Sequence, residues 1–323
     1  MRLLLTGHKQ LALQHGNDWG PVPDNEVLLR VLYCAVCRTD AKMWEQGHRD
    51  LVLPRVPGHE IAGVDSKGRR YVVWPGDSCG NCDYCRAGRE NLCPRIRILG
   101  FHRDGGFADQ VLVPETSLIP VPRTLDTRIA CLAEPVGCVL HALGNCRLRK
   151  HDRILIYGCG TMGLLAALAA RESGAVPLII ENNPAKIKAA AAFLETTGIP
   201  CVEKTSETDF DAVINACPDP AAFGRGLAML GRGGCFCFFS GLGKNMAIAT
   251  DLINLIHYRE ISITGAYGVN RSDMRQAVRF LNGLQPVMGK LIQAVVGPEE
   301  APELMARVLS GGGFKYILKF NGQ

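Results

Sequence analysis

Four cysteines stand close together in one segment of the chain, in the run Cys79-Gly-Asn-Cys82-Asp-Tyr-Cys85 followed by Cys93. Spacings of 3, 3 and 8 residues can hold four thiolates in one tight loop as a closed tetrahedral set of ligands. Zn²⁺ suits such a site, and because no coordination position stays open its role is structural. An iron–sulfur cluster is the alternative, but the intervening residues lack the expected spacing. The sequence therefore predicts a structural zinc site.

A glycine-rich run, Gly158-Cys-Gly160-Thr161-Met162-Gly163, matches the pattern G-x-G-x-x-G. It follows a strand-sized apolar run and opens an Ala- and Leu-rich helical stretch, which is the context that gives the pattern its meaning. Gly158 would allow a tight turn, Gly160 a close approach of the backbone to a pyrophosphate, and Gly163 close packing of helix and strand. The amides at the start of the helix, including Thr161 and Met162, would face the phosphates. The run predicts a dinucleotide site.

An acidic residue follows the next predicted strand, because Glu181 stands eighteen residues after Gly163. A carboxylate at this place accepts hydrogen bonds from ribose hydroxyls and repels a 2′-phosphate. The adjoining Asn182-Asn183-Pro184 contains no arginine, so NAD is favoured over NADP, with Asn182 beside the same ribose. The alternative is a tight glycine turn in a doubly wound domain that binds no nucleotide.

The composition excludes several classes of protein. The chain has 323 residues, with 36 Lys and Arg against 31 Asp and Glu, a net charge of +5 that is too small for a nucleic-acid-binding surface. No apolar run approaches the roughly 20 residues of a membrane span. The apolar run at the start of the chain is too short for the hydrophobic region of a secretory signal. Fourteen cysteines without an export signal favour metal binding in a reducing compartment. We therefore expect a cytoplasmic protein that needs neither membrane nor nucleic acid.

Two parts of the chain differ in the length and spacing of their apolar runs. Over the first ~125 residues, short β-branched runs are broken by Gly and Pro, which is typical of a small antiparallel β-domain. These runs are Val27–Tyr33, Ile61–Val64, Tyr71–Trp74 and Phe107–Val113.

From Arg153 onward, strand-sized apolar runs alternate with helical stretches, an order that predicts a doubly wound parallel sheet of six strands. The strands are expected at Arg153–Tyr157, Pro177–Ile180, Ile199–Val202, Asp211–Ala216, Gly234–Phe239 and Ile261–Thr264, with helices at Met162–Ser173 and Pro184–Thr196. After Gly268 we expect helix, loop, helix and a last strand within Phe314–Phe320. The predicted domains are residues 129–268 for nucleotide binding, and residues 1–128 with 269–323 for catalysis.

Taken in order, these motifs resemble those of the zinc-dependent medium-chain dehydrogenases. The chain carries Cys37-Arg38-Thr39-Asp40, Gly58-His59-Glu60, the four-cysteine run, Glu134-Pro135 and the glycine-rich run at similar spacings. The resemblance spans essentially the whole chain and is greatest to the sorbitol (polyol) and threonine dehydrogenase branch. It implies an α/β fold with a GroES-like, β-rich catalytic domain and a Rossmann NAD-binding domain, and a homo-oligomer, a dimer or tetramer.

The resemblance also implies a second, catalytic zinc, so that each chain would hold two zinc ions and NAD. Its ligands would be Cys37, His59 and a carboxylate, which is Glu60 or Glu134, and we keep both. One thiolate, one imidazole and one carboxylate leave a fourth place open for water or an alcohol. Asp40 would fix the tautomer of the histidine.

The implied reaction is reversible oxidation of a secondary alcohol to a ketone with hydride transfer to NAD⁺. Thr39 resembles the proton-relay hydroxyl of the family, and Arg38 the arginine that contacts the cofactor pyrophosphate. Lys42 stands where many relatives have a relay histidine. The substrate would be a polyol, sugar or amino-cyclitol-like alcohol. A threonine-type 3-dehydrogenase acting on a β-hydroxy amino acid, and a non-catalytic nucleotide-binding protein, are the alternatives.

Three basic residues, Lys42, His48 and Arg103, suggest one further hypothesis about the substrate. If they surround the opening of the active site, they would favour an anionic or aminated-sugar substrate over a plain short alcohol.

Overall fold

The computed structural model describes residues 1–323 except 17–18, 244, 246 and 321–323, so the end of the predicted segment 269–323 lies outside the described residues. The chain forms two compact units: unit 1 is Met1–Gly137 with Val269–Gln323, and unit 2 is Cys138–Gly268. The division falls inside helix α4 (Ala133–Asn145), whereas the sequence placed it between residues 128 and 129. None of the described helices combines the length and the apolar character that crossing a bilayer requires.

Unit 2 is built on one parallel sheet of six strands in the order β12-β11-β10-β13-β14-β15. The strands are β10 (Arg153–Tyr157), β11 (Val176–Ile180), β12 (Cys201–Val202), β13 (Phe210–Asn215), β14 (Leu230–Phe238) and β15 (Ser262–Gly265). The predicted doubly wound sheet is confirmed. Its strand order reverses between β10 and β13, and ligands of such sheets bind at the carboxyl ends of the strands beside that reversal.

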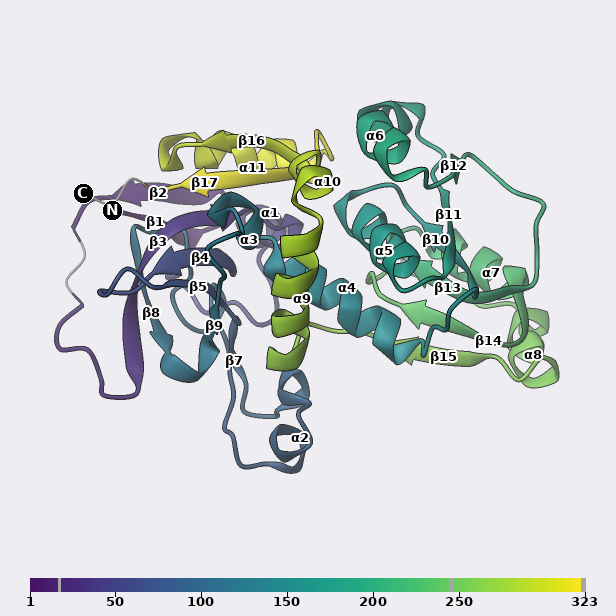
Figure 1. The fold of residues 1–323 in the computed structure, drawn as a ribbon, viewed down its shortest axis with the longest axis horizontal. Helices are drawn as coiled ribbons and strands as arrows, with labels where there is room; N and C mark the ends of the chain where they lie inside the picture. The colour runs from purple at the N-terminus through teal and green to yellow at the C-terminus, as the bar shows by residue number, and fades with distance from the viewer. Residues whose placement is uncertain (17–18, 244, 246, 321–323) are drawn as a thin grey trace. The chain divides into compact units, whose positions relative to one another are not determined.

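Helices connect the successive strands of unit 2 except β12 and β13, which a loop joins (Figure 1), and local signals set the helix ends. The helices are α5 (Thr161–Glu172), α6 (Pro184–Thr197), α7 (Pro220–Met229) and α8 (Thr250–Tyr258). The side chain of Asn183 caps α6, Pro184 occupies its first turn, and Gly198 ends it in the left-handed conformation with φ 65°. Helix α5, rich in Ala and Leu, packs on β10 and β11, which holds the glycine-rich run against the sheet.

Unit 1 contains a larger sheet in the order β16-β17-β3-β4-β5-β9, with β8 also paired to β3. Its strands are β3 (Glu26–Ala35), β4 (Glu60–Val64), β5 (Arg70–Val73), β8 (Gln110–Pro114), β9 (Leu118–Pro120), β16 (Ile292–Val296) and β17 (Lys315–Lys319). All pairs are antiparallel except β16 with β17, which is parallel. The antiparallel pairing predicted for the β-branched runs near the start of the chain is confirmed. The parallel pair belongs to the last part of the chain, where helix α11 (Ala301–Leu309) provides the crossover that a parallel pair needs.

The other elements of unit 1 are short or helical. Strands β1 (Arg2–Gly7) and β2 (Gln10–Gln14) form a hairpin that the sequence analysis did not predict. Two further short strands are β6 (Gly76–Asp77) and β7 (Arg97–Ile98). The remaining elements are the 3₁₀ turns η1 (Glu90–Leu92), η2 (Glu115–Ser117) and η3 (Pro298–Glu300), and the helices α1 (Arg38–Gln46), α2 (Asp83–Arg86), α3 (Thr127–Ala130), α9 (Arg271–Gly283) and α10 (Gln285–Gly289).

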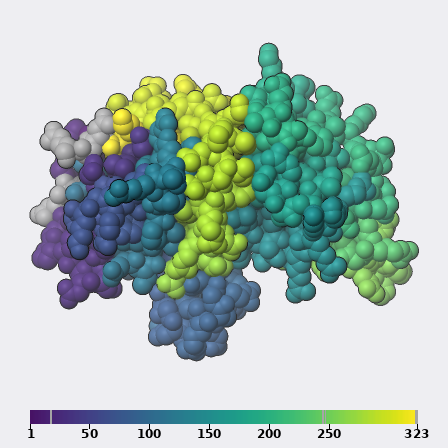
Figure 2. Space-filling model, viewed as in Figure 1, coloured from purple at the N-terminus to yellow at the C-terminus, as the bar shows by residue number. Residues whose placement is uncertain are grey.

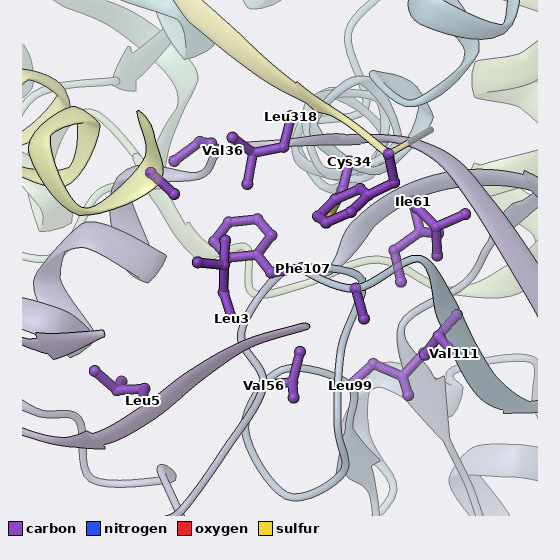
Figure 3. Close-up of a cluster of buried hydrophobic side chains, with 14 of the residues drawn as sticks. Leu3, Leu5, Cys34, Val36, Val56, Ile61, Leu99, Phe107, Val111 and Leu318 are labelled. Atoms are coloured by element: carbon purple, nitrogen blue, oxygen red, sulfur yellow. The ribbon is translucent and has the colours of Figure 1, made fainter. Parts of the chain in front are cut away.

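Phe107 lies inside the core of unit 1, where it is fully buried among apolar side chains from the hairpin, the large sheet and the loops between them (Figure 3). It precedes β8 rather than belonging to it, since its amide donates to the carbonyl of Pro57 instead of a ladder partner. A Cβ on Gly58 would lie 2.4 Å from the Phe107 ring, and Gly58 has φ +93°. Only glycine fits there, so the core fixes the backbone immediately before His59.

Candidate functional site

The four-cysteine run forms a small lobe of unit 1 that includes α2 and η1, drawn in blue and projecting at the lower edge of Figure 2. The four sulfur atoms lie within 4.8 Å of one another, and three of the distances between them are 3.4 Å for Cys82–Cys85, 3.5 Å for Cys93–Cys79 and 3.8 Å for Cys79–Cys85. Four sulfurs placed about 2.3 Å from a zinc ion would be about 3.8 Å apart. The lobe therefore has the shape of a closed tetrahedral zinc site.

Backbone contacts favour a thiolate at one position of this lobe. A hydrogen bond from the backbone of Asn81 is the largest contribution that lowers the pKa of Cys79, which is about 6, whereas the pKa of Cys82 is raised to about 11 by burial and by the neighbouring thiols. The thiolate is the form that binds metal. The lobe is tied to α9 because Arg271 Nε donates to Glu90 Oε1 at 2.9 Å, with Glu90 almost fully buried.

A second cluster in unit 1 combines Cys37, His59 and Glu60, whose potential ligand atoms lie within 4.8 Å of one another. Cys37 is the N-cap of α1, while Glu60 begins β4. Strands β3 and β4 pair Ala35 with Glu60, so the chain beyond β3 returns Cys37 to the place where β4 starts. This arrangement offers one thiolate, one imidazole and one carboxylate to a metal.

Asp40 connects the two halves of this cluster. Its carboxylate accepts the amide of Cys37 at 2.9 Å and the amide of Gly58 at 3.2 Å, and its Oδ1 lies 3.3 Å from His59 Nδ1. Burial lowers the pKa of His59, but Asp40 and Cys37 outweigh burial, so that pKa lies well above its ordinary value. Asp40 thus fixes the backbone at Cys37 and Gly58 and lies within ion-pair distance of His59 Nδ1, which leaves Nε2 as the other ring nitrogen for a metal.

The sequence analysis missed Lys315, which is buried against Glu60. Its Nζ lies 2.5 and 2.7 Å from the two carboxylate oxygens. Burial lowers the pKa of Lys315, but the Glu60 carboxylate more than compensates and raises it. A lysine between apolar residues of a predicted strand, Phe314-Lys315-Tyr316-Ile317, was the available signal, because a buried lysine needs an anionic partner.

Two other predicted catalytic residues, Glu134 and Thr39, interact with this cluster or with the lysine that pairs with it. Glu134 is half-buried in the first turn of α4 and interacts electrostatically with Lys315, but it is outside the group formed by Cys37, His59 and Glu60. The amide of Thr39 donates to Cys37 Sγ at 3.4 Å. Arg38 and Lys42 are exposed on α1.

Arg103 does not have the role that the hypothesis about an anionic substrate gave it. Its guanidinium donates to Glu26 at 2.6 Å and to Asp77 at 2.8 Å, and its side chain is only 12% exposed. Two carboxylates already neutralise this one cation, so Arg103 cannot supply a free positive charge to a substrate.

In unit 2, the glycine-rich run connects β10 to α5 with the geometry expected of a phosphate-binding turn. Gly158 has φ +108°, and a Cβ on Gly163 would lie 1.9 Å from the carbonyl oxygen of Gly158. A Cβ on Gly160 would meet no protein atom within 4 Å, so the space next to this glycine is open to a ligand. Gly160 caps α5 without a side-chain hydrogen bond, which leaves the first amides, including those of Thr161 and Met162, available to an anion.

Glu181 lies directly after β11 and faces the same turn. Its carboxylate accepts the amides of Cys159 at 3.1 Å and Asn183 at 2.9 Å, while Lys186 Nζ is 3.8 Å away. Asn182 between them is exposed. The buried carboxylate therefore joins the glycine-rich turn to the start of α6, at the edge of the sheet where β10 and β11 end.

Comparison with known families gives two matches that follow each other along the chain. Residues 23–123 match the alcohol dehydrogenase GroES-like domain, and residues 161–283 match the zinc-binding dehydrogenase model. The first match covers the four-cysteine lobe and the Cys37 cluster, and the second begins at the first residue of α5.

Individual relatives agree with these matches. The chain is 30% identical to L-galactonate-5-dehydrogenase of Escherichia coli K12, over 81% of this chain and 82% of that protein. It is also 30% identical to sorbitol dehydrogenase of Halalkalibacterium halodurans, over 97% and 96% of the two chains. A zinc-binding dehydrogenase from Sinorhizobium meliloti 1021, solved with bound NADP, superposes with a TM-score of 0.87 at 25% identity, covering 99% of this chain and 98% of that one. The chain belongs to the zinc-dependent medium-chain dehydrogenase family, with a GroES-like domain and a Rossmann domain.

Proposed function

We propose that this protein oxidises a secondary alcohol of a polyol or sugar to a ketone, with transfer of hydride to NAD⁺ and with a catalytic zinc ion. The observation that carries the proposal is the cluster of Cys37, His59 and Glu60, a mixed set of donors separate from the four-cysteine lobe. Mixed sets with an open position are typical of catalytic zinc, whereas closed Cys₄ sets are structural. A non-catalytic nucleotide-binding protein would have no need of the mixed set.

The donors fit zinc, and they suggest which carboxylate binds it. Glu60 reaches the cluster, while Glu134 stands outside it, so we assign Cys37, His59 and Glu60 as the ligands. Lys315 holds both oxygens of Glu60, yet each oxygen retains a lone pair for a metal. Glu134 then adds negative charge near Lys315, and we infer that it supports Lys315 or exchanges with Glu60 at the metal.

Bound zinc supplies Lewis acidity that lowers the pKa of an alcohol hydroxyl, and bound NAD⁺ supplies the hydride acceptor. The residues of this chain orient the ligands, balance their charge and move the proton. Asp40 orients His59 and Cys37, and Lys315 neutralises Glu60. The Thr39 hydroxyl, two residues after Cys37, would accept the proton of the alcohol while it releases its own proton to solvent. We place the adenosine end of NAD at the glycine-rich turn, with its ribose toward Glu181 and Asn182.

Glu181→Gln tests the assignment of the cofactor. Removing the negative charge while keeping the shape should raise the KM for NAD⁺ by about 10- to 100-fold, the effect of losing one or two hydrogen bonds to a charged group. The ratio of kcat/KM with NADP⁺ to that with NAD⁺ should rise, because the carboxylate that repels a 2′-phosphate is gone. Glu203→Gln, an exposed residue of the same unit, is the matched control. An unchanged cofactor ratio would remove Glu181 from the nucleotide site.

A polyol or sugar substrate is favoured over a β-hydroxy amino acid. L-threonine 3-dehydrogenase of Rhizobium johnstonii is 33% identical over 73% of this chain and 71% of that protein, so the relatives include both classes. An amino acid needs a cation for its carboxylate, and Arg103 is already paired with two acids. Of the two cations predicted to bind such a carboxylate, Lys42 alone remains.

The function is tested by following NADH absorbance while purified enzyme is offered polyols, sugar acids, amino alcohols and L-threonine. Zinc is measured on the same sample, with two ions per chain expected. Rapid turnover of L-threonine and none of any polyol would favour the alternative enzyme. One zinc ion per chain and no turnover of any alcohol would favour the non-catalytic protein.

We also propose that the protein is a cytoplasmic homo-oligomer, a dimer or tetramer. Strand β15 is the last strand of its sheet, and its Ile263 is 44% exposed, so this edge can pair with the same edge of a second copy. Light scattering should give the mass of a dimer or tetramer, and Ile263→Lys should shift it toward the monomer. A wild-type monomer at micromolar concentration would contradict the proposal. The cytoplasm is favoured because it keeps zinc-binding thiols reduced.

A further inference from the structure

Three rings form a continuous chain that leads away from the candidate zinc site. The centroid of Phe101 lies 5.5 Å from that of His59 and 5.4 Å from that of His48, and Phe101 is almost completely buried. His48 is therefore two ring contacts from a proposed zinc ligand, and its side chain is 26% exposed. His48 lies just after α1, the helix that Cys37 caps.

The contacts of His48 define which of its nitrogens carries a proton. The amide of Asp50 donates to Nδ1 at 3.2 Å, so in the neutral ring the proton is on Nε2. Burial lowers the pKa of His48, Asp50 opposes that effect, and Arg49, Lys42 and His102 add to it. Within the described residues Nε2 makes no hydrogen bond. In its neutral form, His48 thus keeps an N–H donor that none of the described residues accepts.

In His102, as in His48, a backbone amide donates to the ring Nδ1. The amide of Ile98 donates to His102 Nδ1 at 3.1 Å, which again puts the proton of the neutral ring on Nε2. His102 follows Phe101 directly and is close enough to His48 to affect its charge. The neighbouring cation Arg103 is already paired with Glu26 and Asp77.

We propose that His48 is a specificity-determining residue, whose Nε2–H donates to a hydroxyl of the substrate beyond the carbon that is oxidised. A neutral donor suits a hydroxyl oxygen, which can accept one hydrogen bond while donating another. It gives little advantage to an ammonium or carboxylate group. The preferred substrate is then an uncharged alcohol with several hydroxyls. This inference rests on the proposed function, because it concerns the substrate of the same site.

His48→Phe tests the proposal on zinc-loaded enzyme, since it keeps a ring against Phe101 and removes the donor. We expect kcat/KM for the best polyol to fall at least about 10-fold, mainly through a higher KM, because a substrate hydroxyl would then lose its hydrogen-bond donor. A secondary alcohol without further hydroxyls, such as 2-butanol, should change by less than about threefold. His48→Gln restores an N–H donor and should recover most of the loss. His8→Phe, exposed in the turn between β1 and β2, is the control.

A binding measurement distinguishes an effect of His48 on substrate binding from an effect on the chemical step. The Kd of the polyol for enzyme saturated with NADH, followed by tryptophan fluorescence, should rise by the same factor in His48→Phe and fall back in His48→Gln. Equal losses on the polyol and 2-butanol, or an unchanged Kd, would overturn the proposal. Failure of the proposed function looks different, because no alcohol offered to the wild-type enzyme would then support reduction of NAD⁺, while the Kd values could still be compared.

Discussion

Replacing Cys37 with serine is expected to lower kcat/KM for alcohol oxidation by at least about 10³-fold. Loss of the thiolate weakens the catalytic zinc, whose Lewis acidity is worth several kcal/mol, and about 4 kcal/mol corresponds to that factor. The zinc content should fall from two ions to one per chain, because the four-cysteine lobe shares no residue with the Cys37 cluster. Steady-state kinetics and metal analysis of one preparation check both expectations.

Cys34→Ala is the matched control for this variant. Cys34 is fully buried in the core (Figure 3), and burial raises the pKa of its thiol well above the ordinary value, so it stays protonated. We expect the alanine variant to keep both zinc ions and nearly all activity, with a modest loss of stability from the small cavity. A Cys37→Ser enzyme that retains two zinc ions and normal turnover would refute the assigned ligand set.

Lys315→Met is expected to be the most destabilising change near the site. It leaves the buried Glu60 carboxylate without its cation, and removing one partner of a buried ion pair usually costs about 3–5 kcal/mol. For a unit of this size the melting temperature should fall by on the order of 10 °C. Thermal unfolding followed by circular dichroism, compared with wild type, checks the expectation.

The double variant Glu60→Gln/Lys315→Met separates the ion pair from the packing of the lysine. Removing both charges should recover most of the lost melting temperature, because two well-packed neutral groups often match a buried ion pair. Activity should stay low, because Glu60 is also a proposed ligand. A control at the exposed Lys319 at the end of β17, Lys319→Met, should leave the melting temperature unchanged. If Lys315→Met melts like wild type, the pair has no role in stability.

Motifs that are short in sequence could be interpreted without the tertiary structure. The four-cysteine run closes on itself within fifteen residues, so its spacing alone predicts the lobe. The glycine-rich run gains its meaning from the strand before it and the helix after it, both adjacent in the chain. The six parallel strands could be predicted because most of them are apolar runs of strand length that alternate with helical stretches, a pattern that depends on local composition. The resemblance to a family then supplied Cys37, His59 and the carboxylates as a set.

The sequence by itself therefore determined the local chemistry: two groups of metal donors, a phosphate-binding turn and the alternation of strands and helices along the chain. Only the tertiary structure decided which distant residues meet. Strand β17 pairs with β3, and β3 with β4, so three neighbouring strands bring Lys315, Cys37 and Glu60 together from positions more than 250 residues apart. The same packing assigned Arg103 to Glu26 and Asp77. Such partners are selected by the register between strands, and no periodicity along one segment encodes that register.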